Sequence, residues 1–357
     1  MKILRVESWV EGLALSRPYT ITSGRTEAVE LLFVRIIGQA EIGVGSGAPT
    51  KEITGETVAS SLAAVTGDSL AFLIGRDTRE LGSLLVAVGD NMASTPAARA
   101  AVDMALHDLF ARELDVPLCR FLGGPLFDSM PTSITIGIQS TEEALAEVDE
   151  YLGRGFRVLK VKIGRDLEAD LERLRAIRER AGPDTLIRVD ANEGYALQDA
   201  AQLAACALEL QLELVEQPLP AACWKEFDQL PASLRSVMAL DESVHSPSDA
   251  LEHARDAERC STYVVKLMKC GGIAPARAIS QIAEAAKRKL MWGCMDESVV
   301  SIAAALHVAF ATLSTGYLDL DGHLDLARDL ASGGLQLEDG RLSLTSASGL
   351  GVRWSND

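Results

Sequence analysis

The chain has 357 residues, and its 34 lysines and arginines are outnumbered by 51 aspartates and glutamates, which gives a formal net charge of −17. This acidity argues against binding to a nucleic-acid backbone, because that mode needs a basic face. The length suggests two domains, or one barrel with an added lobe, and the content of 48% hydrophobic and 24% charged residues is that of an ordinary folded protein.

No segment has the pattern of an export signal or a membrane span. Arg5, Glu7 and Glu11 interrupt the apolar residues near the N-terminus, and the longest weakly polar stretch, residues 301–313, is too short to cross a bilayer. The six cysteines form neither a C-x-x-C pair nor a regular framework, which is typical of free thiols in a reducing compartment. We therefore expect a cytoplasmic protein without a membrane partner.

The first part of the chain predicts antiparallel sheet. Residues 1–11 and 31–37 carry β-branched and apolar runs that favour strands. Gly43, Gly45 and Gly47 follow them and indicate a segment rich in turns.

Two helices are expected next. Residues 55–73 and 95–114 have helical patterns, and the second begins with Thr95 as N-cap and Pro96 at the first helical position. The stretch LGGPLFDSMP, residues 122–131, then predicts a break between two lobes.

After this break, short apolar strands alternate with amphipathic helical segments at a repeat of about 25 residues. The eight strand segments are ITIGI, VLKVKIG, LIRVDAN, LELVEQP, VMALDES, TYVVKLM, LMWGCMDES and GYLDLDG. Eight evenly spaced units favour a closed parallel barrel over an open sheet. The predicted class is therefore α/β, with a barrel over residues 125–324 and an α+β capping domain over residues 1–124, completed by residues 325–357.

Charged residues end almost every one of these strands, although strands of a parallel barrel should be apolar on both faces. Asp190, Glu216 and Asp241 end three consecutive strands and lie 26 and 25 residues apart, one barrel repeat each. We expect them side by side at the strand ends where barrel enzymes have their active sites. Converging carboxylates without His or Cys favour a hard cation, Mg²⁺ before Ca²⁺ or Mn²⁺. Salt bridges with helix lysines are the alternative.

Three lysines accompany these acids. Lys160 and Lys162 are two apart on one strand, so both side chains point into the barrel, and Lys266 lies across the barrel from them. An ammonium beside a second ammonium and Mg²⁺ loses part of its preference for charge, so Lys162 can act as a base. The alternative is that the lysines only neutralise the three acids.

The segments LKVKIG, RVDANEGY, VEQPLP, ALDES and VVKLMKCGGI, in this order and spacing, resemble the enolase superfamily in its muconate lactonizing enzyme subgroup, over nearly the whole chain. The resemblance implies a (β/α)7β modified TIM barrel, one Mg²⁺ per subunit and a homo-oligomer. It assigns roles to eight positions: the acid/base catalysts Lys162 and Lys266, the substrate-carboxylate ligand Lys160, the Mg²⁺ ligands Asp190, Glu216 and Asp241, and their supports Asn192 and Glu242.

Within the subgroup, the segment YLDLDG resembles the dipeptide epimerases, such as L-Ala-D/L-Glu epimerase. Asp319 and Asp321 are expected to share one face of the eighth strand and to take the free ammonium of a dipeptide, unless Arg17 or Arg25 neutralises them. Thr135 aligns with a position that contacts substrate in these enzymes.

The resemblance also implies a mechanism, a 1,1-proton transfer at the α-carbon of the dipeptide's C-terminal residue. Mg²⁺ and Lys160 would hold the substrate carboxylate and stabilise an enediolate, while Lys162 and Lys266 exchange the α-proton on opposite faces.

Two positions predict the side chains of the substrate. In the Ala-Glu epimerases an arginine of the loop after the first strand holds the acidic side chain, whereas here Gly24 takes that position and Arg25 lies one place away. Asp296 adds an acid at the end of the seventh strand, where those enzymes carry an apolar residue. Because an anionic side chain would be repelled there, we expect hydrophobic or cationic dipeptides. Alternatively, Asp296 satisfies backbone amides at the start of the next helix.

Other activities on the same scaffold stay open: L-Ala-D/L-Glu epimerase, N-succinylamino acid racemase, o-succinylbenzoate synthase, muconate cycloisomerase and sugar-acid dehydratase. A non-catalytic dipeptide-binding protein is a further alternative. His245, His253 and His307 are interpreted as structural, and the glycine pair of KCGGI as a place where substrate approaches the backbone.

Overall fold

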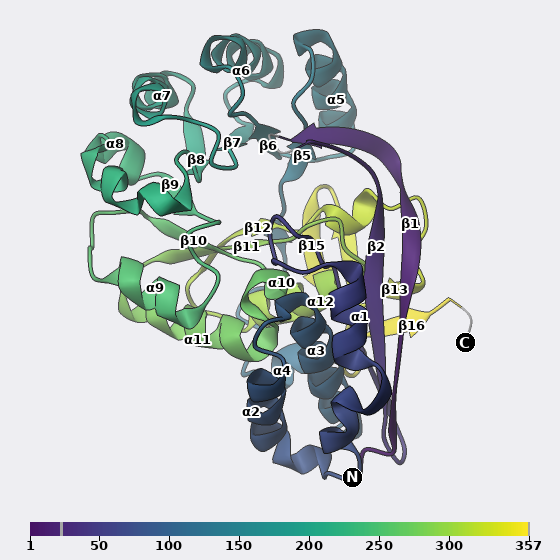
Figure 1. Cartoon of the computed structure of the whole chain (residues 1–357). Coiled ribbons are helices and arrows are strands. Elements are labelled where there is room, and N and C mark those ends of the chain that lie inside the picture. Colours follow the sequence, from purple (N-terminus) through teal and green to yellow (C-terminus); the bar gives the residue numbers. More distant parts are fainter. Residues whose placement is uncertain (22–23, 356–357) are drawn as a thin grey trace.

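Eight parallel strands form the barrel in a computed structural model that describes residues 1–21 and 24–355 (Figure 1). The strands follow one another around the sheet in chain order, and a parallel bridge between Thr132 and Leu318 joins the first strand to the last. They are β5 (Ile134–Ile136), β6 (Val158–Lys162), β7 (Leu186–Asp190), β8 (Leu212–Glu216), β9 (Met238–Leu240), β10 (Thr262–Val265), β11 (Lys289–Gly293) and β12 (Thr315–Asp319). All eight predicted strands and the modified TIM barrel are confirmed.

Helices cover the outside of the barrel after seven of the strands. They are α5 (Thr141–Gly153), α6 (Leu167–Ala181), α7 (Leu197–Glu209), η3 (Ala221–Gln229) with α8 (Ala232–Arg235), α9 (Pro247–Ala254), α10 (Leu267–Cys270) with α11 (Ile273–Ala285), and α12 (Val299–Phe310). The last strand is followed only by the short turn η4 (Gly322–Leu324). Within residues 1–21 and 24–355, none of the helices has the length and apolar character needed to cross a bilayer.

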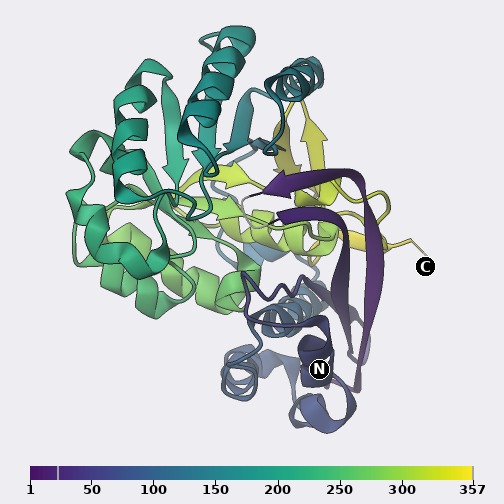
Figure 2. The same cartoon turned by 45° about the horizontal axis from the view of Figure 1, so that its top comes forward.

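The first lobe is built on an antiparallel sheet of β1 (Arg5–Ile21), β2 (Gly24–Ile37) and β3 (Ile42–Gly47). The β1–β2 hairpin is longer than predicted, because its polar second half is held by contacts that sequence patterns do not reveal. Leu15 forms an antiparallel bridge with Leu326, and the Ser16 N–H donates to the Asp325 carbonyl at 2.7 Å. In both Figure 1 and Figure 2, the hairpin runs from the first lobe to the side of the barrel near α5.

Gly43, Gly45 and Gly47 lie on one face of β3, so the predicted turn-rich segment is wrong. This face packs against α3 (Pro96–Glu113), and a Cβ atom at Gly45 would lie 1.9 Å from the carbonyl oxygen of Ala101. Alternate positions of a strand face the same side, so glycine at every second position clears room for the helix backbone.

The predicted helix over residues 55–73 is instead two elements, α1 (Val58–Val65) and η1 (Gly67–Leu73), which are followed by η2 (Thr78–Glu80), α2 (Leu81–Asn91), α3 and α4 (Leu118–Phe121). Thr95 is at the N-cap position of α3 as predicted, but its side chain makes no capping bond. The buried carboxylate of Glu56 accepts the Ala97 N–H in its place.

The glycine pair of KCGGI brings the two lobes together. A Cβ atom at Gly272 would lie 2.6 Å from the Cβ of Asp103 on α3, and the Asp103 carboxylate accepts the Ile273 N–H at 2.7 Å. The interpretation that this pair admits substrate is therefore wrong, because a helix of the first lobe fills the space.

The C-terminal tail folds back on the first lobe, as predicted. Trp354 packs against Trp9 and Phe33, with ring centroids 5.4 and 5.6 Å apart. The tail contains β13 (Ala331–Gly333), β14 (Leu335–Glu338), β15 (Arg341–Leu344) and β16 (Val352–Trp354), and β15 also pairs with β4 (Met130–Pro131). The domain boundary at residues 124 and 125 stays a prediction.

His307, fully buried in α12, should make stability depend on pH. Its Nδ1 accepts the Cys119 N–H at 3.0 Å, so the neutral ring carries its proton on Nε2, which faces the Leu350 carbonyl at 3.3 Å. Burial lowers the pKa of His307 from 6.5 to about 4. The unfolded chain therefore binds this proton at a higher pH than the folded chain does, and stability falls as the pH falls between these values.

Because His307 is protonated more readily in the unfolded chain, we expect it to lower the free energy of unfolding by about 2 kcal/mol when the pH falls from 7 to 5. Urea unfolding of wild type and His307→Asn at both pH values would measure this effect. The variant should lose some stability at pH 7 but show the shallower pH dependence. Parallel pH profiles for the two proteins would contradict the prediction.

Candidate active site

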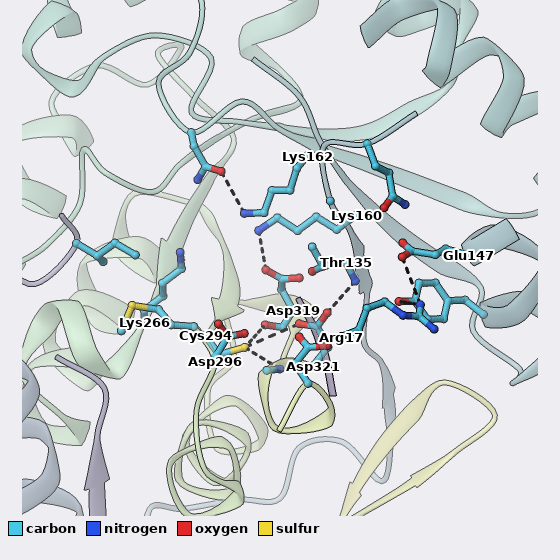
Figure 3. Close-up of a pocket in the computed structure, with 18 of the residues that line it drawn as sticks. Arg17, Thr135, Glu147, Lys160, Lys162, Lys266, Cys294, Asp296, Asp319 and Asp321 are labelled. Atoms are coloured by element: carbon cyan, nitrogen blue, oxygen red, sulfur yellow. Dashed lines mark hydrogen bonds and ion pairs between the residues drawn. The ribbon is translucent and has the colours of Figure 1, made fainter. Parts of the chain in front are cut away.

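A pocket opens at the C-terminal ends of the barrel strands, with a volume of about 890 Å³ including the part open to solvent (Figure 3). Side chains of the barrel and of the β1 strand line it together. Its charged lining consists of Arg17, Lys160, Lys162 and Lys266 with Glu147, Glu242, Asp296, Asp319, Asp321 and Asp325. The pocket lies where the strand-end charges predicted an active site.

Lys162 and Lys266 approach this pocket from opposite sides of the barrel. Lys162 ends β6 and Lys266 directly follows β10, with three strands between them in a barrel of eight. The Nζ of Lys162 donates to Asp190 at 2.7 Å, and the Nζ of Lys266 donates to Asp241 at 2.6 Å. Two amine groups can therefore reach a molecule in the pocket from its two faces.

Asp190, Glu216 and Asp241 lie on adjacent strand ends, as the spacing predicted. Asp190 and Glu216 are register partners in β7 and β8, and Asp241 follows β9 directly. All three are almost completely buried, with exposed fractions of 0, 1 and 2%.

Lysines form ion pairs with these carboxylates. The ammonium of Lys160 lies 3.1 Å from Asp190, 2.8 Å from Glu216 and 2.7 Å from Asp319. Burial opposes its charge, but these three acids raise the pKa of Lys160 well above that of a free lysine. Since each acid turns toward an ammonium, no group of three or more His, Cys, Asp or Glu side chains in the described part of the chain is gathered closely enough to hold a metal ion.

The donor set nevertheless fits a divalent cation. Glu216 Oε1 and Glu242 Oε2 are buried and have no hydrogen-bond partner among the described residues. Burial, and then the charge of Asp190, raise the pKa of Glu216 well above its ordinary value. Buried carboxylates that neighbouring side chains satisfy only in part are suitable ligands for a hard cation such as Mg²⁺.

Asn192 and Glu242 connect the lysines to the acids. Asn192 has a left-handed backbone with φ of 41°, its N–H donates to Asp190 at 2.9 Å, and its Oδ1 accepts from Lys162 at 3.2 Å. Its Nδ2 donates to Glu242, whose pKa is raised to about 7 by burial and then by Asp241. Both residues therefore lie where the resemblance expected supports of the metal ligands.

Lys269 is a buried contact of Asp241 that the sequence interpretation missed. Its Nζ donates to the Asp241 carbonyl at 2.6 Å and also to the Asp241 carboxylate. The only signal for it was its position three residues after Lys266, in the helix that follows β10.

Asp319 and Asp321 do not share a strand face, because β12 ends at Asp319. Asp319 is bound by Lys160 and by the Ser133 hydroxyl at 2.6 Å, so it is not an uncompensated carboxylate. Asp321 accepts the N–H of Thr135 at 2.8 Å, and burial followed by the charge of Asp319 raises its pKa to about 6.

Among the described side chains, Arg17 forms no ion pair with these aspartates. Arg17 instead binds Glu147 at 3.3 Å and Glu150 at 2.7 Å on α5. The side chain of Arg25 lies outside the described part of the chain.

Asp296 lines the pocket and is 8% exposed. It is not the cap of the following helix, because the Ser298 side chain caps α12 and Asp329 accepts the Val299 N–H. The interpretation of Asp296 as a pocket residue therefore agrees with its position. The sequence interpretation missed two other acids of the pocket, Asp325 and Glu147.

A parallel barrel whose mouth carries lysines on two sides of buried carboxylates defines an acid/base enzyme of the TIM-barrel class. Residues 143–357 match the family model described as enolase C-terminal domain-like, and residues 6–123 match that of the mandelate racemase / muconate lactonizing enzyme N-terminal domain. The chain therefore belongs to the mandelate racemase/muconate lactonizing enzyme family of the enolase superfamily, which confirms the resemblance.

Dipeptide epimerases are among the similar proteins. The L-Lys-D/L-Arg epimerase of Methylococcus capsulatus is 47% identical over 353 residues, 99% of each chain. The hydrophobic dipeptide epimerase of Enterococcus faecalis is 34% identical over 356 residues, also 99% of each chain. A crystal structure of the dipeptide epimerase from M. capsulatus with Mg and the dipeptide L-Arg-D-Lys has a TM-score of 0.97, at 47% identity, over 99% of this chain and 100% of that one.

Proposed function

We propose that the protein is a Mg²⁺-dependent dipeptide epimerase, an isomerase that inverts the α-carbon of the C-terminal residue. The observation that carries this proposal is the placement of Lys162 and Lys266 on opposite sides of one pocket. A single base can remove a proton and return it to the same face, but inversion needs a proton donor on the other face.

Cationic dipeptides are the proposed substrates. Asp296 lines the pocket, and the similar protein from M. capsulatus is an L-Lys-D/L-Arg epimerase. An acidic substrate side chain would meet carboxylates in this pocket, so L-Ala-D/L-Glu epimerisation is disfavoured by like-charge repulsion. A hydrophobic side chain would not complement the charge of these carboxylates.

The residues at the pocket have separate roles in the proposed reaction. Asp190, Glu216 and Asp241 would hold Mg²⁺, which when bound neutralises charge that develops on the substrate carboxylate. Lys160 adds a positive charge beside these acids. Lys162 takes or returns the α-proton on one face, and Lys266 does so on the other.

Asp321 is the proposed contact for the free ammonium of the dipeptide. Its carboxylate lines the pocket and receives one backbone N–H, that of Thr135. N-succinylamino acids, o-succinylbenzoate precursors and muconate lack an ammonium, so the related activities on this scaffold have no use for this carboxylate.

Deuterium exchange tests the proposal directly. With Mg²⁺ in D₂O, the protein should introduce one α-deuterium into the C-terminal residue of L-Lys-L-Arg and form its L,D epimer, as read by mass spectrometry and NMR. The Nα-acetylated dipeptide, which lacks the ammonium, should react at least roughly tenfold more slowly. Absence of α-deuterium in cationic, hydrophobic and acidic dipeptides alike would refute epimerase function.

We further propose a cytoplasmic location and a homo-oligomeric state. All six cysteines are free thiols, which suits a reducing compartment. The oligomeric state rests on the family resemblance, and analytical ultracentrifugation would measure it.

A further inference from the structure

Arg188 is a buried cation that the proposed reaction does not use. It lies on β7, two residues before Asp190, so both side chains point into the barrel, and its own is 3% exposed. Its Nε donates to Glu213 on β8 at 2.6 Å, and its guanidinium lies 5.0 Å from the centroid of the Tyr317 ring on β12. Contacts with two other strands therefore fix the guanidinium inside the barrel.

The far end of this guanidinium reaches Ser133, the residue before β5. The Nη1 of Arg188 donates to the Leu318 carbonyl at 2.7 Å and lies 3.5 Å from the hydroxyl oxygen of Ser133, which is fully buried. The Ser133 N–H donates to the same carbonyl at 3.1 Å. A carbonyl oxygen has two lone pairs, so these two donors occupy the Leu318 carbonyl.

The proton of the Ser133 hydroxyl is therefore directed to Asp319. A serine hydroxyl has one proton to donate. The occupied Leu318 carbonyl lies 3.3 Å from the hydroxyl oxygen, whereas Oδ1 of Asp319 lies at 2.6 Å. The positive charge of Arg188 favours the same orientation, because it attracts the lone pairs of the hydroxyl oxygen.

Asp319 is held between this hydroxyl and the ammonium of Lys160. Its Oδ1 accepts from Ser133, and its Oδ2 accepts from Lys160 at 2.7 Å (Figure 3). The other two acids at this ammonium, Asp190 and Glu216, are proposed ligands of Mg²⁺. Asp319 is therefore the acid that can direct the Lys160 ammonium without also binding the metal.

We propose that Ser133 and Arg188 are positioning residues. Through Asp319, they direct the Lys160 ammonium toward the carboxylate of the dipeptide. Asp319 and Lys160 line the pocket, whereas Ser133 and Arg188 lie behind them. The inference rests on the proposed dipeptide epimerase function and adds two residues to its machinery.

A dipeptide and its C-terminal amide separate the two ends of the substrate. In Ser133→Ala, kcat/KM for L-Lys-L-Arg should fall roughly 10- to 100-fold, the range for loss of a hydrogen bond to a charged group. The amide L-Lys-L-Arg-NH₂ has no carboxylate for Lys160, so its inhibition constant should change less than about threefold. Arg188→Lys keeps a positive charge for Glu213 but loses the forked contact, and it should show the same pattern.

The double variant tests whether the two residues act through one contact. Because each single change already releases Asp319, Ser133→Ala combined with Arg188→Lys should lower kcat/KM less than about threefold below the slower single variant. Ser280→Ala is the matched control, since it removes an equally buried hydroxyl that donates to the Ala276 carbonyl at 2.8 Å in α11. Its kcat/KM should stay within about twofold of wild type.

The possible outcomes are distinct. Equal weakening of the dipeptide and its amide, multiplied losses in the double variant, or an unchanged kcat/KM in Ser133→Ala would each overturn the inference while the wild type remains an epimerase. If one single variant does not fold, the other decides between these outcomes. If the wild-type protein turned over no dipeptide, the proposed function itself would fail.

Discussion

Lys162→Met and Lys266→Met should each abolish epimerisation but keep exchange of the α-proton on one face of the substrate. General acid–base groups contribute roughly 10² to 10⁴-fold to rate, and inversion needs both lysines, so we expect kcat for epimerisation to fall at least about 10³-fold. The remaining lysine still faces one side of the α-carbon. Each variant should therefore incorporate deuterium from D₂O into only one epimer of the dipeptide, and the two variants should select opposite epimers.

The measurement is NMR of α-proton loss from L,L and L,D dipeptides incubated separately with each variant and Mg²⁺. Methionine keeps most of the volume of the lysine stem, and thermal unfolding would confirm that the variants fold. Lys225→Met, at an exposed lysine, is the control for removal of a positive charge. If either variant exchanged the α-proton of both epimers, the assignment of one lysine to each face of the substrate would be wrong.

Mg²⁺ should stabilise the folded protein through Asp190, Glu216 and Asp241. A ligand at about 100 times its dissociation constant adds about 2.7 kcal/mol to the unfolding free energy when only the folded state binds it. We expect a stabilisation of this order in wild type after treatment with EDTA and titration with Mg²⁺. Activity should be lost with EDTA and return with the metal.

Glu216→Gln should reduce this stabilisation sharply, because the amide keeps the shape of the side chain but removes a charged ligand. The matched control is Glu213→Gln on the same strand, whose carboxylate pairs with Arg188 at 2.6 Å. That variant should keep the full Mg²⁺-dependent shift whatever its own stability. An equal shift in wild type and Glu216→Gln would exclude Glu216 as a ligand.

The buried charges explain why both effects should be large. Lys160 is 2% exposed and contacts three carboxylates, and Lys266 and Lys269 both contact Asp241. Loss of one member of such a set leaves an uncompensated charge in a region from which water is excluded. Substitutions that keep volume are therefore needed to separate a change in chemistry from a change in folding.

The sequence by itself determined the barrel and the main elements of its site. The alternation of strands and helices fixed eight parallel strands, and parallel strands bring their carboxyl ends to one edge. Asp190, Glu216 and Asp241, one repeat apart, therefore had to lie on neighbouring strand ends, and Lys160 and Lys162, two apart, had to face the interior. These inferences hold because they depend only on the period of the strand and of the barrel.

Only the tertiary structure decided what lies beyond the ends of the strands. Asp321 leaves β12 and turns to Thr135, and Asp325 is fixed by Ser16, which is more than 300 residues away along the chain. Gly45 faces a helix rather than a turn. Strand periodicity stops where a strand stops, so these positions are set by contacts between distant segments, which no local pattern of residues encodes.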